Sequence, residues 1–90
     1  MFFVYLLESQ VDESWYIGYT PDSPVNRLEK HNVGKAYYTR RKLPWKLIYY
    51  EAYVTRGDAL GREKFLKSGA GRNFLKKQLK YYLAHGSEAV

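Results

Sequence analysis

Glu63 is the first candidate for chemistry, because its residue type conflicts with its expected position. With about 100° per residue on a helix, Glu63 lies about 40° from Ala59 and close to Leu66 on the apolar stripe. It is also the only acid between Asp58 and Glu88, in a stretch rich in lysine and arginine. A carboxylate on a buried face is costly unless it is paired or binds a metal. Two alternatives follow: a salt bridge to a neighbouring base, or a ligand of Mg²⁺, which commonly takes one carboxylate and keeps several waters.

Arg27 and His31 lie four residues apart in an expected helix, so they share one face. An arginine there could bind phosphate oxygens and stabilise charge that develops in a transition state. A histidine could move a proton or donate a hydrogen bond to a phosphate. The alternative is a solvated helix face on which Arg27 pairs with Glu29 or Asp22.

Two tyrosines of an expected N-terminal hairpin, Tyr5 and Tyr16, could face one another across the sheet. One alternative is a cross-strand aromatic pair, worth up to about 1 kcal/mol. The other is a phenol that acts on a proton. Since the ordinary tyrosine pKa is about 10, that role requires nearby cations that lower the pKa, as a strongly positive site would. Tyr19 points to the opposite face and is expected in the core.

The segment KAYYTRRK, residues 35–42, interleaves tyrosines with basic residues. Nucleic-acid grooves combine stacking platforms with positive charge in this way. The alternative is an exposed loop whose tyrosines fold back onto the core. The candidates for nucleic-acid contact in this segment are Lys35, Tyr38, Arg40, Arg41 and Lys42. Two more candidates, Arg72 and Asn73, lie in the basic stretch 62–77, where Asn73 is the only amide; surface polarity near a helix start is the alternative for Asn73.

Charge is distributed unevenly along the 90 residues. The net charge is +6, but residues 1–29 hold five acids and one base, whereas residues 30–90 hold fourteen bases and four acids. This asymmetry indicates a polyanionic partner, most often nucleic acid, or else a solvated basic surface. The chain has no cysteine, which excludes disulfides and thiolate metal sites and fits a reducing compartment.

The apolar start, MFFVYLLES, is interpreted as a strand rather than a signal peptide. It lacks a basic leader and a small-residue cleavage site, and Glu8 ends it early. No apolar run approaches the roughly 20 residues that span a bilayer. We therefore expect a cytoplasmic protein, with a single domain over residues 1–83 and a flexible tail over residues 84–90.

The expected elements place these candidates on a small α/β (α+β) domain. Strands are predicted over residues 2–7, 15–20 and 45–54. A first helix is predicted between Ser23, which can cap it with Pro24 at its first position, and Gly34, which suits the left-handed position after it.

Two more helices are predicted in the C-terminal half. Thr55 and Asp58 resemble a capping box for a helix that reaches about Lys67. The glycines of SGAG then break this helix, and RNFLKKQLKYYL is predicted as an amphipathic third helix. The expected order is ββαβαα, a three-stranded sheet flanked by three helices.

These landmarks together resemble the GIY-YIG nuclease family, and most closely its small stand-alone bacterial members. The first motif is FVY, residues 3–5, and the second is YIG, residues 16–18. Arg27 and His31, the aromatic-basic loop and Glu63 follow in the family's order. The resemblance covers about residues 2–80.

The resemblance implies metal-dependent hydrolysis of phosphodiester bonds in nucleic acid, with DNA favoured and with DNA repair or recombination as possible settings. Mg²⁺ is the expected metal, and Mn²⁺ can replace it. Tyr5 would be the general base, assisted by Tyr16, which would also position the water or a phosphate. Arg27 would stabilise charge on phosphorus, His31 would aid phosphate contact or proton transfer, and Glu63 would hold the metal. The resemblance further implies that Tyr38 lies near the phosphate, that a side chain at Gly18 would crowd the site, and that Asn73 matches a late asparagine.

The sequence departs from the family pattern at two positions and in its extent. Phe3 replaces the glycine of the first motif, and Val4 replaces its isoleucine. We expect no second DNA-binding domain, so a partner protein could supply specificity. Two rival interpretations stay open: a non-cleaving nucleic-acid-binding module, and an interaction protein whose basic face meets an acidic protein.

Overall fold

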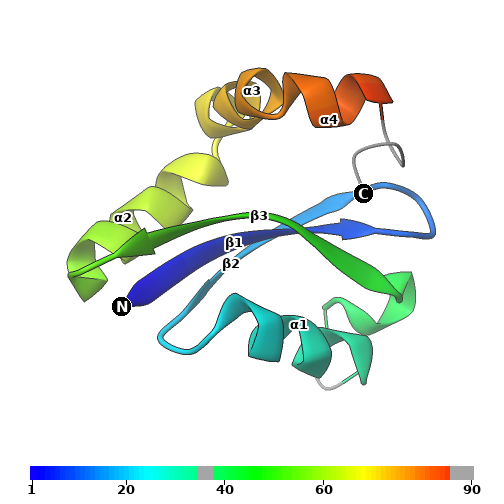
Figure 1. Cartoon of the computed structure of the whole chain (residues 1–90), viewed down its shortest axis with the longest axis horizontal. Coiled ribbons are helices and arrows are strands. Elements are labelled where there is room, and N and C mark those ends of the chain that lie inside the picture. The colour runs from blue at the N-terminus through cyan, green and yellow to red at the C-terminus, as the bar shows by residue number, and fades with distance from the viewer. Residues whose placement is uncertain (35–37, 86–90) are drawn as a thin grey trace.

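The computed structural model describes residues 1–34 and 38–85. Within these residues the chain forms one three-stranded antiparallel sheet of order β2-β1-β3, with α1 on one face and α2, α3 and α4 on the other (Figure 1). The elements are β1 (Phe2–Ser9), β2 (Trp15–Thr20), α1 (Pro24–Asn32), the 3₁₀ turn η1 (Arg40–Lys42), β3 (Trp45–Tyr53), α2 (Arg56–Leu66), α3 (Gly69–Gln78) and α4 (Lys80–His85). No described helix is long and apolar enough to cross a membrane.

The central strand β1 is buried on both faces because helices cover both sides of the sheet. Side chains alternate between the two faces of a strand. Val4 and Leu6 therefore pack into a core with α2 and α3, whereas Tyr5 and Leu7 pack with Trp45 into a second core. As predicted, Tyr19 packs against the first of these cores.

The predicted limits of α1 are confirmed. The Ser23 hydroxyl accepts hydrogen bonds from the backbone N–H groups of Val25 (3.1 Å) and Asn26 (3.4 Å), with Pro24 at the first helical position. Gly34 adopts φ 77°, the left-handed conformation that glycine tolerates.

The predicted capping box of α2 is wrong in its geometry. Thr55 is the N-cap residue, but its hydroxyl donates to Asp58 Oδ2 at 2.6 Å and makes no capping bond to the backbone. The short Asp58 side chain competes for the hydroxyl that a capping box would direct to the helix N-terminus.

The predicted third helix differs in its start and in its continuity. It begins at Gly69, within SGAG, because the Ser68 hydroxyl accepts a hydrogen bond from the Gly71 N–H at 3.1 Å and caps it. A Cβ at Gly71 would lie 2.0 Å from the Phe65 carbonyl oxygen, so this glycine lets α3 pack closely on the end of α2. The segment then divides at Leu79 into α3 and α4, and residues 84 and 85 of the expected tail belong to α4. The described order is therefore ββαβααα; residues 86–90 of the tail lie outside the described residues.

Candidate active site

Three predicted residues meet in one hydrogen-bonded cluster on the α1 face of the sheet. The Tyr5 hydroxyl of β1 lies 3.0 Å from His31 Nε2. Arg27 Nε donates a hydrogen bond to the same hydroxyl at 3.3 Å. The four-residue spacing of Arg27 and His31 places both side chains on the face of α1 that meets the sheet.

Gly18 provides the space for the Tyr5 ring. The two residues are directly opposite in the β1–β2 register. A Cβ at position 18 would lie 2.3 Å from the Tyr5 hydroxyl oxygen, closer than any unstrained contact. The absence of a side chain at position 18 lets the Tyr5 phenol lie across the edge strand β2. A side chain at this position, which was predicted to crowd the site, would clash with Tyr5 itself.

Tyr16 joins the cluster as a diagonal neighbour of Tyr5. The register places Tyr16 opposite Leu7 rather than opposite Tyr5. Its ring is 5.0 Å from the His31 ring and 6.4 Å from the Tyr5 ring, centroid to centroid. Tyr16 is partly exposed, whereas Tyr5 is only 1% exposed, so Tyr16 forms the outer part of the cluster.

Burial controls the protonation of the cluster. Desolvation, and then the charge of Arg27, lower the pKa of His31 to about 4, so this imidazole is neutral at pH 7. Desolvation also raises the pKa of Tyr5, although the hydrogen bond and charge of Arg27 oppose the rise. The condition set for Tyr5 as a base, a pKa lowered by nearby cations, is not met by the described residues, because the loss of water outweighs one guanidinium.

Arg27 carries a positive charge without a carboxylate partner in the described part of the chain. The predicted alternative, an ion pair with Glu29 or Asp22, is not formed: the three salt bridges among the described residues all lie elsewhere. The partly buried guanidinium beside a neutral phenol is available to an anion.

Glu63 lies on α2 within electrostatic reach of this cluster. Ala59 and Leu66 of the same helix are buried, as predicted, and the Glu63 side chain is 20% exposed. The salt-bridge alternative is formed, because Lys67 Nζ lies 3.1 Å from Glu63 Oε2. The Glu63 charge also contributes to the raised pKa of Tyr5, which connects α2 electrostatically to the α1 face.

Glu63 is the predicted protein ligand of a divalent cation. No group of three or more His, Asp or Glu side chains suited to a metal occurs in residues 1–34 and 38–85. Lys67 occupies one Glu63 oxygen, and the other has no hydrogen bond to a described residue. Such a donor set fits Mg²⁺, which is commonly bound through one or two carboxylates together with waters and substrate phosphates.

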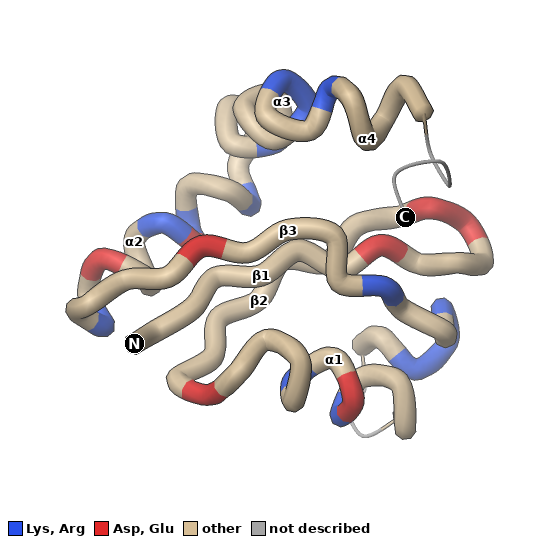
Figure 2. The backbone as a smooth tube through the Cα atoms, viewed as in Figure 1, with Lys and Arg blue, Asp and Glu red and all other residues tan. Residues whose placement is uncertain are grey.

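The predicted nucleic-acid contacts fall on two separate surfaces (Figure 2). Arg40, Arg41 and Lys42 form the exposed turn η1, where Lys42 pairs with Asp12 at 3.1 Å. Tyr38 beside this turn is 86% exposed, so it does not fold back onto the core. Lys35 lies outside the described residues.

Arg72 and Asn73 lie on α3, across the sheet from the Tyr5 cluster. The Arg72 guanidinium is 5.3 Å from the centre of the Trp15 ring, which packs against the α2–α3 core. Asn73 is exposed. The structure therefore does not bring these two residues together with Tyr5, Arg27 and His31.

Sequence reasoning missed Thr39. Its side chain is 1% exposed, and its Oγ1 lies 2.7 Å from His31 Nδ1. The residue lies inside the KAYYTRRK segment, but only its distance of eight residues from His31 could have drawn attention to it.

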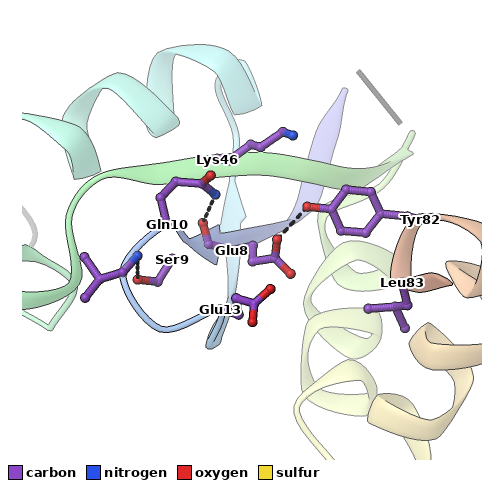
Figure 3. A pocket seen from close by; sticks show the side chains of 8 residues that line it. Glu8, Ser9, Gln10, Glu13, Lys46, Tyr82 and Leu83 are labelled. Carbon is purple, nitrogen blue, oxygen red and sulfur yellow. Dashed lines mark hydrogen bonds between the residues drawn. The ribbon is translucent and has the colours of Figure 1, made fainter. Parts of the chain in front are cut away.

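A pocket of about 440 Å³ lies away from the cluster, between the β1–β2 hairpin and α4 (Figure 3). Glu8 is at its centre. One Glu8 oxygen accepts from the Tyr82 hydroxyl at 2.5 Å, and the other accepts from Trp15 Nε1 at 3.1 Å. Both oxygens are thus used to tie α4 and β2 to β1, and the pocket contains none of the predicted catalytic residues.

Comparison with known families agrees with this arrangement. Residues 1–78 match the model of the GIY-YIG catalytic domain, and the chain belongs to this family. Family membership supports a nuclease-type function, and the predicted resemblance and fold are confirmed.

Small proteins named UPF0213 are similar to this chain. A UPF0213 protein of Streptococcus pyogenes serotype M1 is 39% identical over 87 residues, covering 96% of this chain and 89% of the relative. One from Streptococcus pneumoniae serotype 4 is 47% identical over 66 residues, which cover 72% of this chain and 65% of the relative. The solution NMR structure of a Bacillus halodurans UPF0213 protein has a TM-score of 0.52 and 37% identity, covering 98% of this chain and 90% of that one.

Proposed function

We propose that this chain is a divalent-metal-dependent endonuclease that hydrolyses phosphodiester bonds in nucleic acid, with DNA as the favoured substrate. The observation that carries the proposal is the Arg27–Tyr5–His31 cluster, in which a guanidinium without a carboxylate partner among the described residues adjoins a phenol hydrogen-bonded to a neutral imidazole. This combination offers one group for phosphate charge and two groups for proton movement.

The raised pKa of Tyr5 indicates a relay rather than a standing phenolate. In the proposed step, water gives a proton to the Tyr5 oxygen while the Tyr5 proton passes to His31 Nε2, 3.0 Å away. The water oxygen forms a bond to phosphorus, the bond from phosphorus to the leaving oxygen breaks, and solvent protonates the leaving oxygen. Tyr5 stays neutral in this step and His31 becomes the imidazolium. Burial and Arg27 disfavour that cation, and the negative charge of the bound phosphate would offset them.

Arg27 has the geometry to stabilise the phosphoryl group. Its Nε donates to Tyr5, which orients the guanidinium and leaves the Nη groups for phosphate oxygens. Tyr16, the more exposed ring of the cluster, would hold the water or a phosphate oxygen beside Tyr5.

Glu63 would hold the metal through its carboxylate. When bound, the divalent cation would stabilise negative charge on the phosphate and the leaving oxygen. Lys67 would then release Glu63 Oε2 or share it, and substrate phosphate could replace the carboxylate as the partner of the lysine.

The substrate class rests on charge. Arg40 and Arg41 on η1, with the exposed Tyr38, lie in the segment that follows α1, and Arg72 and Asn73 add a second basic surface on α3. Contacts to phosphates predict binding that weakens steeply with salt. A role in DNA repair or recombination, with a protein partner that supplies specificity, belongs to the same proposal.

A cleavage assay tests the function. The substrates are labelled single-stranded, duplex and branched DNA, and RNA, each with Mg²⁺, Mn²⁺ or EDTA. We expect metal-dependent cutting that Glu63→Gln and Tyr5→Phe reduce by about 100-fold or more. The matched controls are Glu13→Gln and Tyr81→Phe, which change exposed residues outside the cluster. Equal loss in a variant and its control would contradict the assigned role.

One observation favours a second candidate function, a nucleic-acid-binding module that does not cut. Tyr5 is 1% exposed, and Lys67 already pairs with Glu63. The proposed base, Tyr5, and the proposed metal ligand, Glu63, are therefore both covered in this conformation. Salt-sensitive binding without cutting under any metal condition would establish this candidate and exclude the nuclease for the isolated chain.

A further inference from the structure

His31 has a polar partner at each ring nitrogen, and the second partner is Thr39. Nε2 lies 3.0 Å from the Tyr5 hydroxyl, and Nδ1 lies 2.7 Å from Thr39 Oγ1. The His31 side chain is 0% exposed and Thr39 is 1% exposed, so bulk water does not compete for either nitrogen.

The direction of the Tyr5–His31 hydrogen bond fixes the direction of the His31–Thr39 hydrogen bond. Arg27 Nε, a donor only, already donates to the Tyr5 oxygen. Among the described residues this hydroxyl has no other hydrogen-bonding partner than Arg27 and His31. A buried hydroxyl proton without an acceptor is costly, so His31 Nε2 is assigned as the acceptor for the Tyr5 proton. In a neutral imidazole with an accepting Nε2, the remaining proton is on Nδ1, which then donates to Thr39 Oγ1.

We propose that Thr39 is a positioning residue, which holds His31 in the neutral Nδ1-protonated tautomer and keeps Nε2 available for the Tyr5 proton. The catalytic consequence rests on the proposed function. The tautomer itself does not, since it follows from the hydrogen bonds of the folded protein.

A closed ring of hydrogen bonds holds Thr39 at this distance. The Trp45 indole N–H donates to the Thr39 carbonyl oxygen at 2.8 Å, and Trp45 is 5% exposed. The Asn32 side chain accepts from the Trp45 backbone N–H at 2.6 Å and donates to the Trp45 carbonyl at 2.9 Å. Because Asn32 follows His31 in the chain, the ring returns to α1. A partner that is itself held in place keeps the His31 imidazole in one orientation better than a single free contact does.

Two substitutions separate the hydroxyl from the shape of the side chain. Thr39→Ser keeps the oxygen, whereas Thr39→Val replaces it with a methyl group of similar size and leaves Nδ1–H without that acceptor. The matched control is Thr20→Val, which removes the hydroxyl of another buried threonine (3% exposed) at the end of β2.

The test reads the tautomer directly. Long-range ¹H–¹⁵N NMR spectra distinguish protonated from unprotonated ring nitrogens, and the chain has only two histidines, so a His85→Gln variant assigns the signals. We expect His31 to be Nδ1-protonated at pH 7 in the wild type, Thr39→Ser and Thr20→Val. We expect Thr39→Val to move it toward the Nε2-protonated form. A wild-type His31 protonated on Nε2 would overturn the proposal even if no variant folded, and so would an unchanged spectrum in folded Thr39→Val.

Cleavage kinetics then test the catalytic consequence. We expect Thr39→Val to lower kcat by about 10-fold to 100-fold with little change in KM, and Thr39→Ser to restore most of it. An unchanged kcat in Thr39→Val would overturn the positioning role. A wild-type protein that never cuts would contradict the proposed function alone, because the NMR result decides the tautomer separately.

Discussion

Two arginine–tyrosine clusters in this molecule differ in the group beside the arginine: one contains a carboxylate and the other an imidazole. On β3 and α2, Glu51 accepts hydrogen bonds from Arg62 Nε (2.8 Å) and Nη2 (3.1 Å), and from the hydroxyls of Tyr49 (2.5 Å) and Tyr53 (2.6 Å). Each Glu51 oxygen thus has two donors, and the charge of Arg62 is neutralised. At the Tyr5 cluster, Arg27 has a phenol and an imidazole nearby and no carboxylate in hydrogen-bonding contact among the described residues.

The difference separates a cluster whose charges are matched from the cluster that the proposed function uses. Burial alone would raise the pKa of Glu51, but its four hydrogen bonds bring the pKa below its ordinary value. A fully satisfied network of this kind stabilises the sheet against α2 and has no capacity left for a ligand. The Arg27 cluster leaves positive charge unmatched, a destabilising arrangement that an anionic substrate would relieve.

The largest expected effect is on catalysis at Arg27. Arg27→Ala removes the group for phosphate charge, and we expect cleavage to fall about 1,000-fold, or about 4 kcal/mol in the activation barrier. The unfolding free energy should change by less than about 1 kcal/mol, because only one hydrogen bond is lost. Single-turnover cleavage and urea titration measure the two quantities. A stability loss as large as the catalytic loss would mean that Arg27 is structural.

The converse substitution is Arg62→Met. It leaves the partly buried Glu51 without its cation, and we expect the unfolding free energy to fall by about 2 kcal/mol. Metal-dependent cleavage by the folded fraction should be unchanged. Urea titration at pH 7 tests this, and a selective loss of cleavage at unchanged stability would reverse the assignment of the two clusters.

On acidification, the two clusters should lose their contributions to stability over different pH ranges. The pKa of His31 is lowered from 6.5 to about 4, so the unfolded chain binds the proton first and stability falls as the pH decreases from about 6.5 to about 4. The loss at His31 should reach about 3 kcal/mol by pH 4. Glu51, whose pKa is also lowered, contributes stability that is lost only below its unfolded pKa near 4.5. Unfolding curves of the wild type and His31→Gln between pH 7 and pH 4 measure the difference, and parallel curves would contradict the burial of a neutral His31.

The smallest effect on stability is expected from removing one hydroxyl from each cluster. Tyr49→Phe removes one donor to Glu51 and should cost about 1 kcal/mol of stability with normal cleavage. Tyr5→Phe should cost a similar amount of stability but abolish most cleavage. If the two variants behave alike in the cleavage assay, the contrast between the clusters is lost.

The sequence alone determined which residues could share a face. The period of a strand places Tyr5, Tyr16 and Gly18 on one side of the hairpin, and the four-residue spacing of Arg27 and His31 places both on one side of α1. Ser23, Pro24 and Gly34 fixed the limits of that helix, since caps act within a few residues. These are local effects, and local effects can be read along the chain.

Only the tertiary structure decided what those faces meet and what results. The Tyr5 hydroxyl and His31 are 26 residues apart, and no local pattern reveals that their contact is buried. Burial raises the Tyr5 pKa although Arg27 lies beside the phenol, because desolvation depends on every element that covers it. The same dependence explains why Thr39 was missed. The salt bridge of Glu63 to Lys67 differs, since it joins positions i and i+4 of one helix and was among the alternatives that the sequence offered. A partner or a pKa is a property of the packed surroundings, which distant segments of the chain supply.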